Sequence, residues 1–124
     1  MRLLLDTHVV LWWLADEGLT PRAREAIADP ANLAVVSAAS AWEISIKKAL
    51  GKLSAPDDLE QQVHAGGFLP LAISIGHAIA AGQLARHHDD PFDRMLIAQA
   101  FAEGLTIVTR DKRFDDYGVP LLAA

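Results

Sequence analysis

Four acidic residues lie where a predicted strand ends or where a predicted helix has just begun: Asp6, Glu43, Asp93 and Asp111. Asp6 and Asp111 follow short apolar runs, each typical of a buried strand. Asp93 lies one turn inside a helix whose start Asp89 and Asp90 are already placed to cap, so its carboxylate is free for another task. Carboxylates are the ligands that hard divalent cations such as Mg²⁺ prefer, and four converging acids suit one or two such ions.

Each of these acids also has an ordinary structural explanation. Asp6 can cap a helix, Asp93 can interact with the positive end of the helix dipole, and Asp111 can begin a polar turn. Glu43 can form a capping box with Ser40, or an exposed ion pair with the lysine four residues later. If the acids had structural roles alone, they should be scattered over both ends of the sheet. All four lie just after a strand or near the start of a helix, which favours a common site.

The elements that must position these acids alternate along the chain. Apolar and β-branched runs predict strands at 2–5, 33–36, 69–73, 105–109 and 119–122. Capping residues and periodicity predict one helix that begins at Thr7 and further helices at 21–29, 37–52, 57–64, 74–85 and 90–103. This alternation predicts one α/β domain over residues 1–124, a three-layer α/β/α sandwich with a central, mainly parallel sheet of about five strands. In such a sheet the carboxyl ends of the strands share one edge, where ligands bind.

Acids gathered around one or two divalent ions would suit the hydrolysis of a phosphodiester bond. Two metal ions about 3.5–4 Å apart activate a water molecule and stabilise the leaving oxygen, so no nucleophilic side chain is required. We interpret Asp93 as a metal ligand or as the carboxylate that positions the attacking water.

Composition limits the other function classes. The net charge of −5, from 11 basic and 16 acidic residues, argues against a broad basic surface for nucleic acid. Basic residues that flank the acids either contact RNA phosphates or form ordinary solvated faces: Lys47, Lys48, Lys52, Arg94, Arg110, Lys112 and Arg113.

The lack of cysteine favours a cytoplasmic setting, and the apolar run before Asp6 is too short for a signal peptide or membrane span. The five histidines lack zinc-motif spacing, and we interpret them as capping or surface groups.

The motifs resemble the PIN-domain ribonucleases, and most closely the VapC toxins of bacterial toxin-antitoxin pairs. The segments that carry the resemblance are LLLDTHVVLWWL, SAASAWEISIKKALGKL, DDPFDRMLIAQA and LTIVTRDKRF. It implies an endoribonuclease that uses Mg²⁺ or Mn²⁺, with Asp6, Glu43, Asp93 and Asp111 as its catalytic and metal-binding acids. It also implies supporting hydroxyls at Thr7 and Thr109, and a further acid at either Asp115 or Asp116.

The same resemblance implies a homodimer and a small antitoxin protein that blocks the site with a peptide segment. Tryptophans are candidates for these surfaces: Trp12, Trp13 and Trp42. Since adjacent helical residues point in different directions, we expect one of Trp12 and Trp13 in the core and the other at an interface.

Rival interpretations remain at this stage. An aspartyl-phosphate-type phosphohydrolase could use Asp6 as its nucleophile, but a second Asp is expected where this chain has His8. A receiver-type signalling domain needs a lysine that we cannot place. A non-catalytic protein-binding module, with the acids as caps, is the third alternative. Neither the phosphohydrolase nor the receiver domain predicts a role for Asp93.

Overall fold

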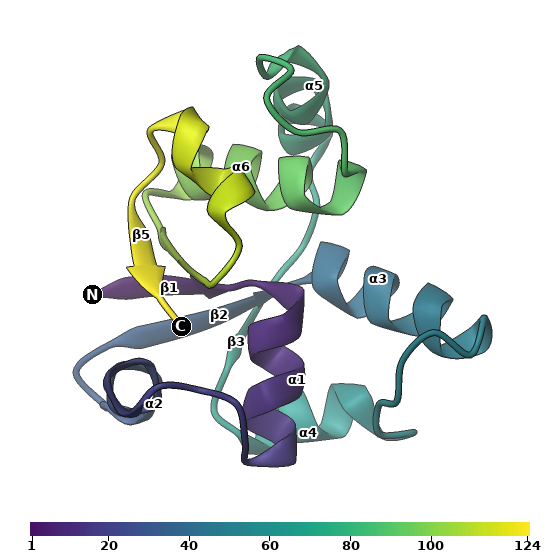
Figure 1. The fold of residues 1–124 in the computed structure, drawn as a ribbon, viewed down its shortest axis with the longest axis vertical. Coiled ribbons are helices and arrows are strands. Elements are labelled where there is room, and N and C mark those ends of the chain that lie inside the picture. The colour runs from purple at the N-terminus through teal and green to yellow at the C-terminus, as the bar shows by residue number, and fades with distance from the viewer.

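The computed structural model describes residues 1–124 and contains one sheet of five parallel strands (Figure 1). The strands are β1 (Arg2–Leu5), β2 (Leu33–Ser37), β3 (Leu69–Leu71), β4 (Thr106–Thr109) and β5 (Leu121–Ala123). Their order across the sheet is β3-β2-β1-β4-β5, and every neighbouring pair is parallel. The predicted α/β class and mainly parallel sheet are therefore confirmed. The last strand begins later than predicted, after Pro120, which has no N–H to donate to a strand ladder.

The helices are α1 (Thr7–Ala15), α2 (Pro21–Ala28), α3 (Ala38–Ala49), α4 (Leu59–Ala65), α5 (Ile75–Gln83) and α6 (Pro91–Glu103). A 3₁₀ helix, η1 (Lys112–Tyr117), occupies the segment predicted as a polar turn. Thr7 is the first residue of α1 rather than its cap, because the Asp6 side chain accepts from the Thr7 N–H. None of the helices is both long and apolar enough to cross a bilayer.

Alternation along β1 explains the three layers. Leu3 and Leu5 point into one core, which α1, α2 and α4 cover, whereas Leu4 points into the opposite core beneath α6 and η1. All three leucines are fully buried. Figure 1 shows α1, α2 and α4 on one side of the sheet and α5, α6 and η1 on the other.

Strand order reverses at the centre of the sheet. From β1 the chain proceeds outward to β2 and β3 on one side, and it then returns to place β4 and β5 on the other. A crevice forms outside the carboxyl ends of two neighbouring strands where connections diverge in this way. Asp6 follows β1 at this point and Asp111 follows β4.

Candidate active site

Asp6 is held rigidly at the end of β1. Its Oδ1 accepts a hydrogen bond from the Thr7 backbone N–H at 2.7 Å, and its Oδ2 accepts one from the Thr109 hydroxyl at 2.7 Å. Thr109 ends β4, so this contact joins the two central strands beside the crevice. Burial raises the pKa of Asp6 above its ordinary value, and the charge of Glu43 adds to this effect.

Glu43 is buried in α3, and its two carboxylate oxygens have separate partners. The Thr7 hydroxyl donates to Oε1 at 2.6 Å, and the Lys47 ammonium donates to Oε2 at 2.5 Å. This hydrogen bond with Glu43 raises the pKa of Lys47. The capping-box interpretation is wrong because Ser37 caps α3, while Ser40 faces the Thr7 hydroxyl at 3.1 Å. The ion pair with Lys47 exists, but only 3% of Glu43 is exposed.

Asp93 does not cap its helix. The cap of α6 is Asp90, whose Oδ1 accepts from the N–H groups of Phe92 at 2.8 Å and Asp93 at 3.2 Å. Asp89 is exposed and lies one residue before this cap, so it takes no part in it. Burial, with the neighbouring charges of Asp6 and Asp90, raises the pKa of Asp93 to about 7. In the metal-free protein Asp93 therefore keeps its proton to a higher pH than an ordinary aspartate.

His88 is a site residue that the sequence interpretation missed. Its Nε2 lies 2.6 Å from Oδ2 of Asp93, and only 6% of the residue is exposed. The interpretation of the histidines as capping or surface groups holds for His77, which forms a capping box with Ser74, but it is wrong for His88. A histidine two residues before a helix cap has no recognised local signature, so no sequence signal marked it.

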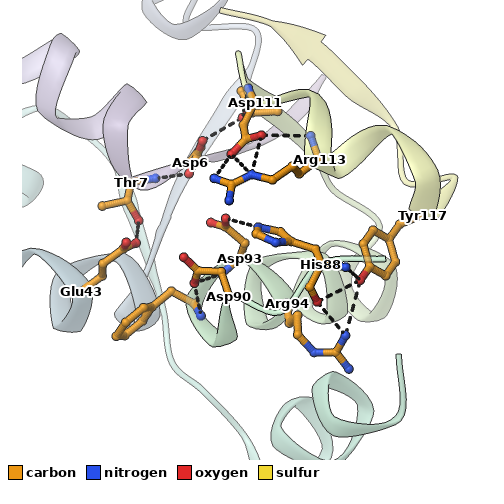
Figure 2. A network of polar contacts seen from close by, with 12 residues as sticks. Asp6, Thr7, Glu43, His88, Asp90, Asp93, Arg94, Asp111, Arg113 and Tyr117 are labelled. Atoms are coloured by element: carbon orange, nitrogen blue, oxygen red, sulfur yellow. Dashed lines mark hydrogen bonds and ion pairs between the residues drawn. The ribbon is translucent and has the colours of Figure 1, made fainter. Parts of the chain in front are cut away.

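Asp111 caps η1 and forms a bidentate ion pair. The Arg113 guanidinium donates to both carboxylate oxygens, from Nε at 3.1 Å and from the terminal nitrogen at 2.7 Å. These hydrogen bonds hold the pKa of Asp111 below its ordinary range. In Figure 2 the Arg113 guanidinium lies between Asp111 and Asp93, and 63% of the Arg113 side chain is exposed.

All four predicted acids line one pocket with a volume of about 220 Å³. Its wall consists mainly of charged residues: Asp6, His8, Trp12, Glu43, Lys47, Asp90, Asp93, Arg110, Asp111 and Arg113. Thr7 and Thr109 are buried and donate hydrogen bonds to carboxylates of this wall, Thr7 to Glu43 (Figure 2) and Thr109 to Asp6. Asp115 and Asp116 are exposed and line no part of the pocket, so the structure does not bring the predicted further acid to this site.

The basic residues divide into two groups. Lys47, Arg110 and Arg113 line the pocket. Arg94, in contrast, points away and donates to backbone carbonyls that include those of Ala81 and Leu84. Neither of the two explanations considered for the basic residues, phosphate contact or a solvated face, therefore fits Arg94.

The tryptophans occupy three different environments. Trp12 lines the pocket beneath the Arg110 guanidinium, which lies 4.1 Å from its ring centre. Trp13 packs edge-on against buried Phe68 in the core. Trp42 is 60% exposed and packs only partly, against Phe92.

The donor set of the pocket fits a hard divalent cation. Carboxylate oxygens of Asp90 and Asp93 lie within 4.8 Å of each other, and the charge of Asp6 helps to raise the pKa of Asp93. Oxygen donors with surplus negative charge are what Mg²⁺ and Mn²⁺ prefer. With positive side chains at its rim, the pocket can hold a cation together with an anionic substrate.

Comparison with known proteins identifies the family of this chain. The sequence profile of the PIN domain matches residues 3–120, which is nearly the whole chain. The chain belongs to the PIN domain family. Among curated PIN-domain relatives, Ribonuclease VapC22 from Mycobacterium tuberculosis is 31% identical over 125 residues, covering 94% of this chain and 92% of that protein.

Solved structures show the same PIN-domain fold. VapBC2 from Rickettsia felis, bound to a DNA fragment from its promoter, matches with a TM-score of 0.74 at 16% identity. That match covers 100% of this chain and 99% of the other. DNA-bound VapBC from Salmonella typhimurium matches with a TM-score of 0.72 at 22% identity, over 99% and 98% of the two chains.

Proposed function

We propose that this PIN-domain protein is a metal-dependent endoribonuclease that acts as the toxin of a type II toxin-antitoxin pair. The observation that carries the proposal is the pocket to which Asp6, Glu43, Asp93 and Asp111 contribute from four separate segments. Its position at the reversal of strand order, and the 31% identity to a ribonuclease, support the same assignment.

Asp6, Glu43, Asp93 and Asp111 would hold the cation, and Asp90, which lines the same pocket, adds negative charge beside Asp93. When bound, Mg²⁺ or Mn²⁺ supplies Lewis acidity for water activation and compensates charge at the phosphorus centre. Lys47 and Arg113 would orient the phosphate group, since both present positive charge to the pocket. The buried helix that carries Asp93 fixes the position of its backbone beside the pocket.

Cleavage of RNA by purified protein tests this function. Wild type should cleave single-stranded RNA with Mg²⁺ or Mn²⁺ and lose activity in chelator. Asp6→Asn and Asp93→Asn should each lower the rate by about 100-fold or more, because each removes a charge that would hold the cation. Asp115→Asn is the matched control, since Asp115 lies outside the pocket, and it should cleave like wild type.

Cleavage that survives chelator or both substitutions would contradict the metal mechanism. A folded wild type without any activity would favour the alternative of a protein-binding module. Circular dichroism of each variant separates loss of activity from loss of fold.

The proposal of an antitoxin partner rests on structurally similar proteins, which include a toxin-antitoxin complex from Klebsiella pneumoniae with a TM-score of 0.66. We expect a small protein encoded beside this gene to bind the chain and inhibit cleavage. We also expect a homodimer, for which exposed Trp42 is a candidate contact. Light scattering and inhibition assays with the neighbouring gene product test both expectations.

A further inference from the structure

We infer that His88 is a positioning residue, which fixes the Asp93 carboxylate in the orientation that binds the cation. The inference rests on the proposed metal-dependent function. It starts from the 2.6 Å hydrogen bond between Nε2 of His88 and Oδ2 of Asp93, which lies beside the charged pocket (Figure 2). Only 4% of the His88 side chain and 9% of the Asp93 side chain are exposed.

Packing fixes the His88 ring itself. The ring meets Phe114 at 70° with a centroid distance of 6.4 Å, and Phe114 is fully buried. Phe114 belongs to η1, the same element that follows Asp111. The histidine therefore fills a space between α6 and η1, the two elements that carry Asp93 and Asp111.

Two side chains, Arg94 and Tyr117, hold the His88 backbone. The Arg94 guanidinium donates to the carbonyl oxygen of His88 at 3.1 Å, and also to those of Ala81, Leu84 and Ala85. The Tyr117 hydroxyl accepts from the His88 N–H at 2.9 Å and donates to the Ala85 carbonyl oxygen at 2.8 Å. We call Arg94 and Tyr117 the loop clamp.

The loop clamp connects the loop that carries His88 to the helix that carries Asp93. Arg94 follows Asp93 directly in α6, so one helical turn both presents the acid and ties down the loop that supplies its hydrogen-bond partner. Like charges on Asp6 and Asp90 would otherwise push the Asp93 carboxylate toward other rotamers. A donor on Oδ2 opposes that rotation and leaves Oδ1 to bind the cation.

This geometry also separates positioning from ligation. The 2.6 Å contact with Oδ2 of Asp93 already occupies Nε2 of His88, so the inference assigns the cation to the carboxylate and not to the imidazole.

Metal affinity of the protein without RNA gives the sharpest test. In calorimetric titrations with Mn²⁺, His88→Ala should bind about 10- to 100-fold more weakly than wild type, the usual effect of removing a partner of a metal ligand. His88→Gln should recover most of the affinity, since its amide N–H can replace the Nε2–H donor. His64→Ala is the matched control. His64 is an exposed histidine of α4 outside the acidic pocket, so this variant should bind Mn²⁺ as tightly as wild type.

RNA cleavage adds a second readout. If His88 only positions Asp93, high Mn²⁺ concentration should restore much of the kcat of His88→Ala. Tyr117→Phe keeps the ring but removes the clamp hydroxyl. As a single substitution it should weaken Mn²⁺ binding several-fold, and in a double variant with His88→Ala it should weaken binding no further. This variant keeps the test valid if His88→Ala does not fold, as judged by its melting curve.

The outcomes that would overturn the inference are distinct from failure of the proposed function. Unchanged Mn²⁺ affinity in folded His88→Ala, in a protein whose wild type binds Mn²⁺ and cleaves RNA, overturns the positioning role alone. Loss that His88→Gln does not restore, with wild-type preference for Co²⁺ or Ni²⁺ over Mg²⁺, would instead make His88 a direct ligand. A wild type that neither binds Mn²⁺ nor cleaves RNA overturns the proposed function and the inference together.

Discussion

The hydroxyl of Thr7 donates a 2.6 Å hydrogen bond to Oε1 of Glu43, so the first residue of α1 fixes a carboxylate of α3. This contact joins α1 to α3 behind the pocket wall. Neither residue reaches solvent to any useful extent, since 2% of Thr7 and 3% of Glu43 are exposed.

Replacing Thr7 by valine should weaken both the fold and the reaction. Valine keeps the shape of the side chain but leaves Oε1 of buried Glu43 without its donor, which should lower the free energy of unfolding by about 1–3 kcal/mol. Thr7→Ser retains the hydroxyl and should lose much less. Urea denaturation measures the first effect and RNA cleavage the second. Equal behaviour of the valine variant and wild type would show that the hydrogen bond contributes nothing.

The metal-free protein should become less stable as the pH rises from about 4 to about 7. The pKa of Asp93 is about 7 in the folded state and 3.8 ordinarily, so within this window the unfolded chain loses the proton while the folded chain retains it. Asp93→Asn should remove this part of the pH dependence and raise the melting temperature in chelator at pH 8.

Melting curves at pH 5 and pH 8, compared between Asp93→Asn and wild type, isolate this contribution from other titrating groups. Asp111 has a lowered pKa, so its own contribution disappears only as the pH falls below about 4, outside the window. The prediction fails if the difference between the two proteins is the same at both pH values.

Arg113→Gln should return the pKa of Asp111 toward its ordinary value. The bidentate hydrogen bonds from Arg113 are the main cause of the low pKa, and glutamine carries no charge. The change can be followed by NMR titration of the Asp111 carboxyl carbon in metal-free protein. Lys112→Gln provides the control, because its side chain is exposed and makes no hydrogen bond to Asp111. A pKa that stays low in Arg113→Gln would contradict this assignment.

Gly18→Ala should destabilise the protein, whereas Gly82→Ala should not. Gly18 has a φ of +91°, and a Cβ there would lie 3.0 Å from the Trp12 ring. Backbone strain alone should cost about 1–3 kcal/mol. Gly82 lies in α5 with open space around the added Cβ, so alanine should stabilise by about 0.4–1 kcal/mol through the unfolded chain. Urea denaturation of the two variants checks the opposite signs.

The parts of the fold that depend on local patterns could be predicted from the sequence. Apolar runs such as Arg2–Leu5 and the Pro-initiated helix α6 lie close to where periodicity and capping placed them. Asp6 and Asp111 could be grouped because parallel strands end at a common edge, which is a rule of topology.

Side-chain contacts between segments far apart in the chain could not be predicted from the sequence. His88 gains its place from Tyr117 and from carbonyl contacts of Arg94, and nothing near His88 in the chain signals either. The capping box assigned to Glu43 matched a local motif, but the actual cap is Ser37 and the actual partner is Thr7, 36 residues away. Side-chain partners between distant elements depend on how those elements pack.

The pairing of β4 with β1 also has a consequence during protein synthesis. β1 is among the first segments to leave the ribosome, but its neighbour β4 and the acid at position 111 follow only after six helices have been made. A nascent or prematurely terminated chain that ends before this point lacks one wall of the pocket. The four-acid pocket can therefore assemble only after translation has passed residue 111.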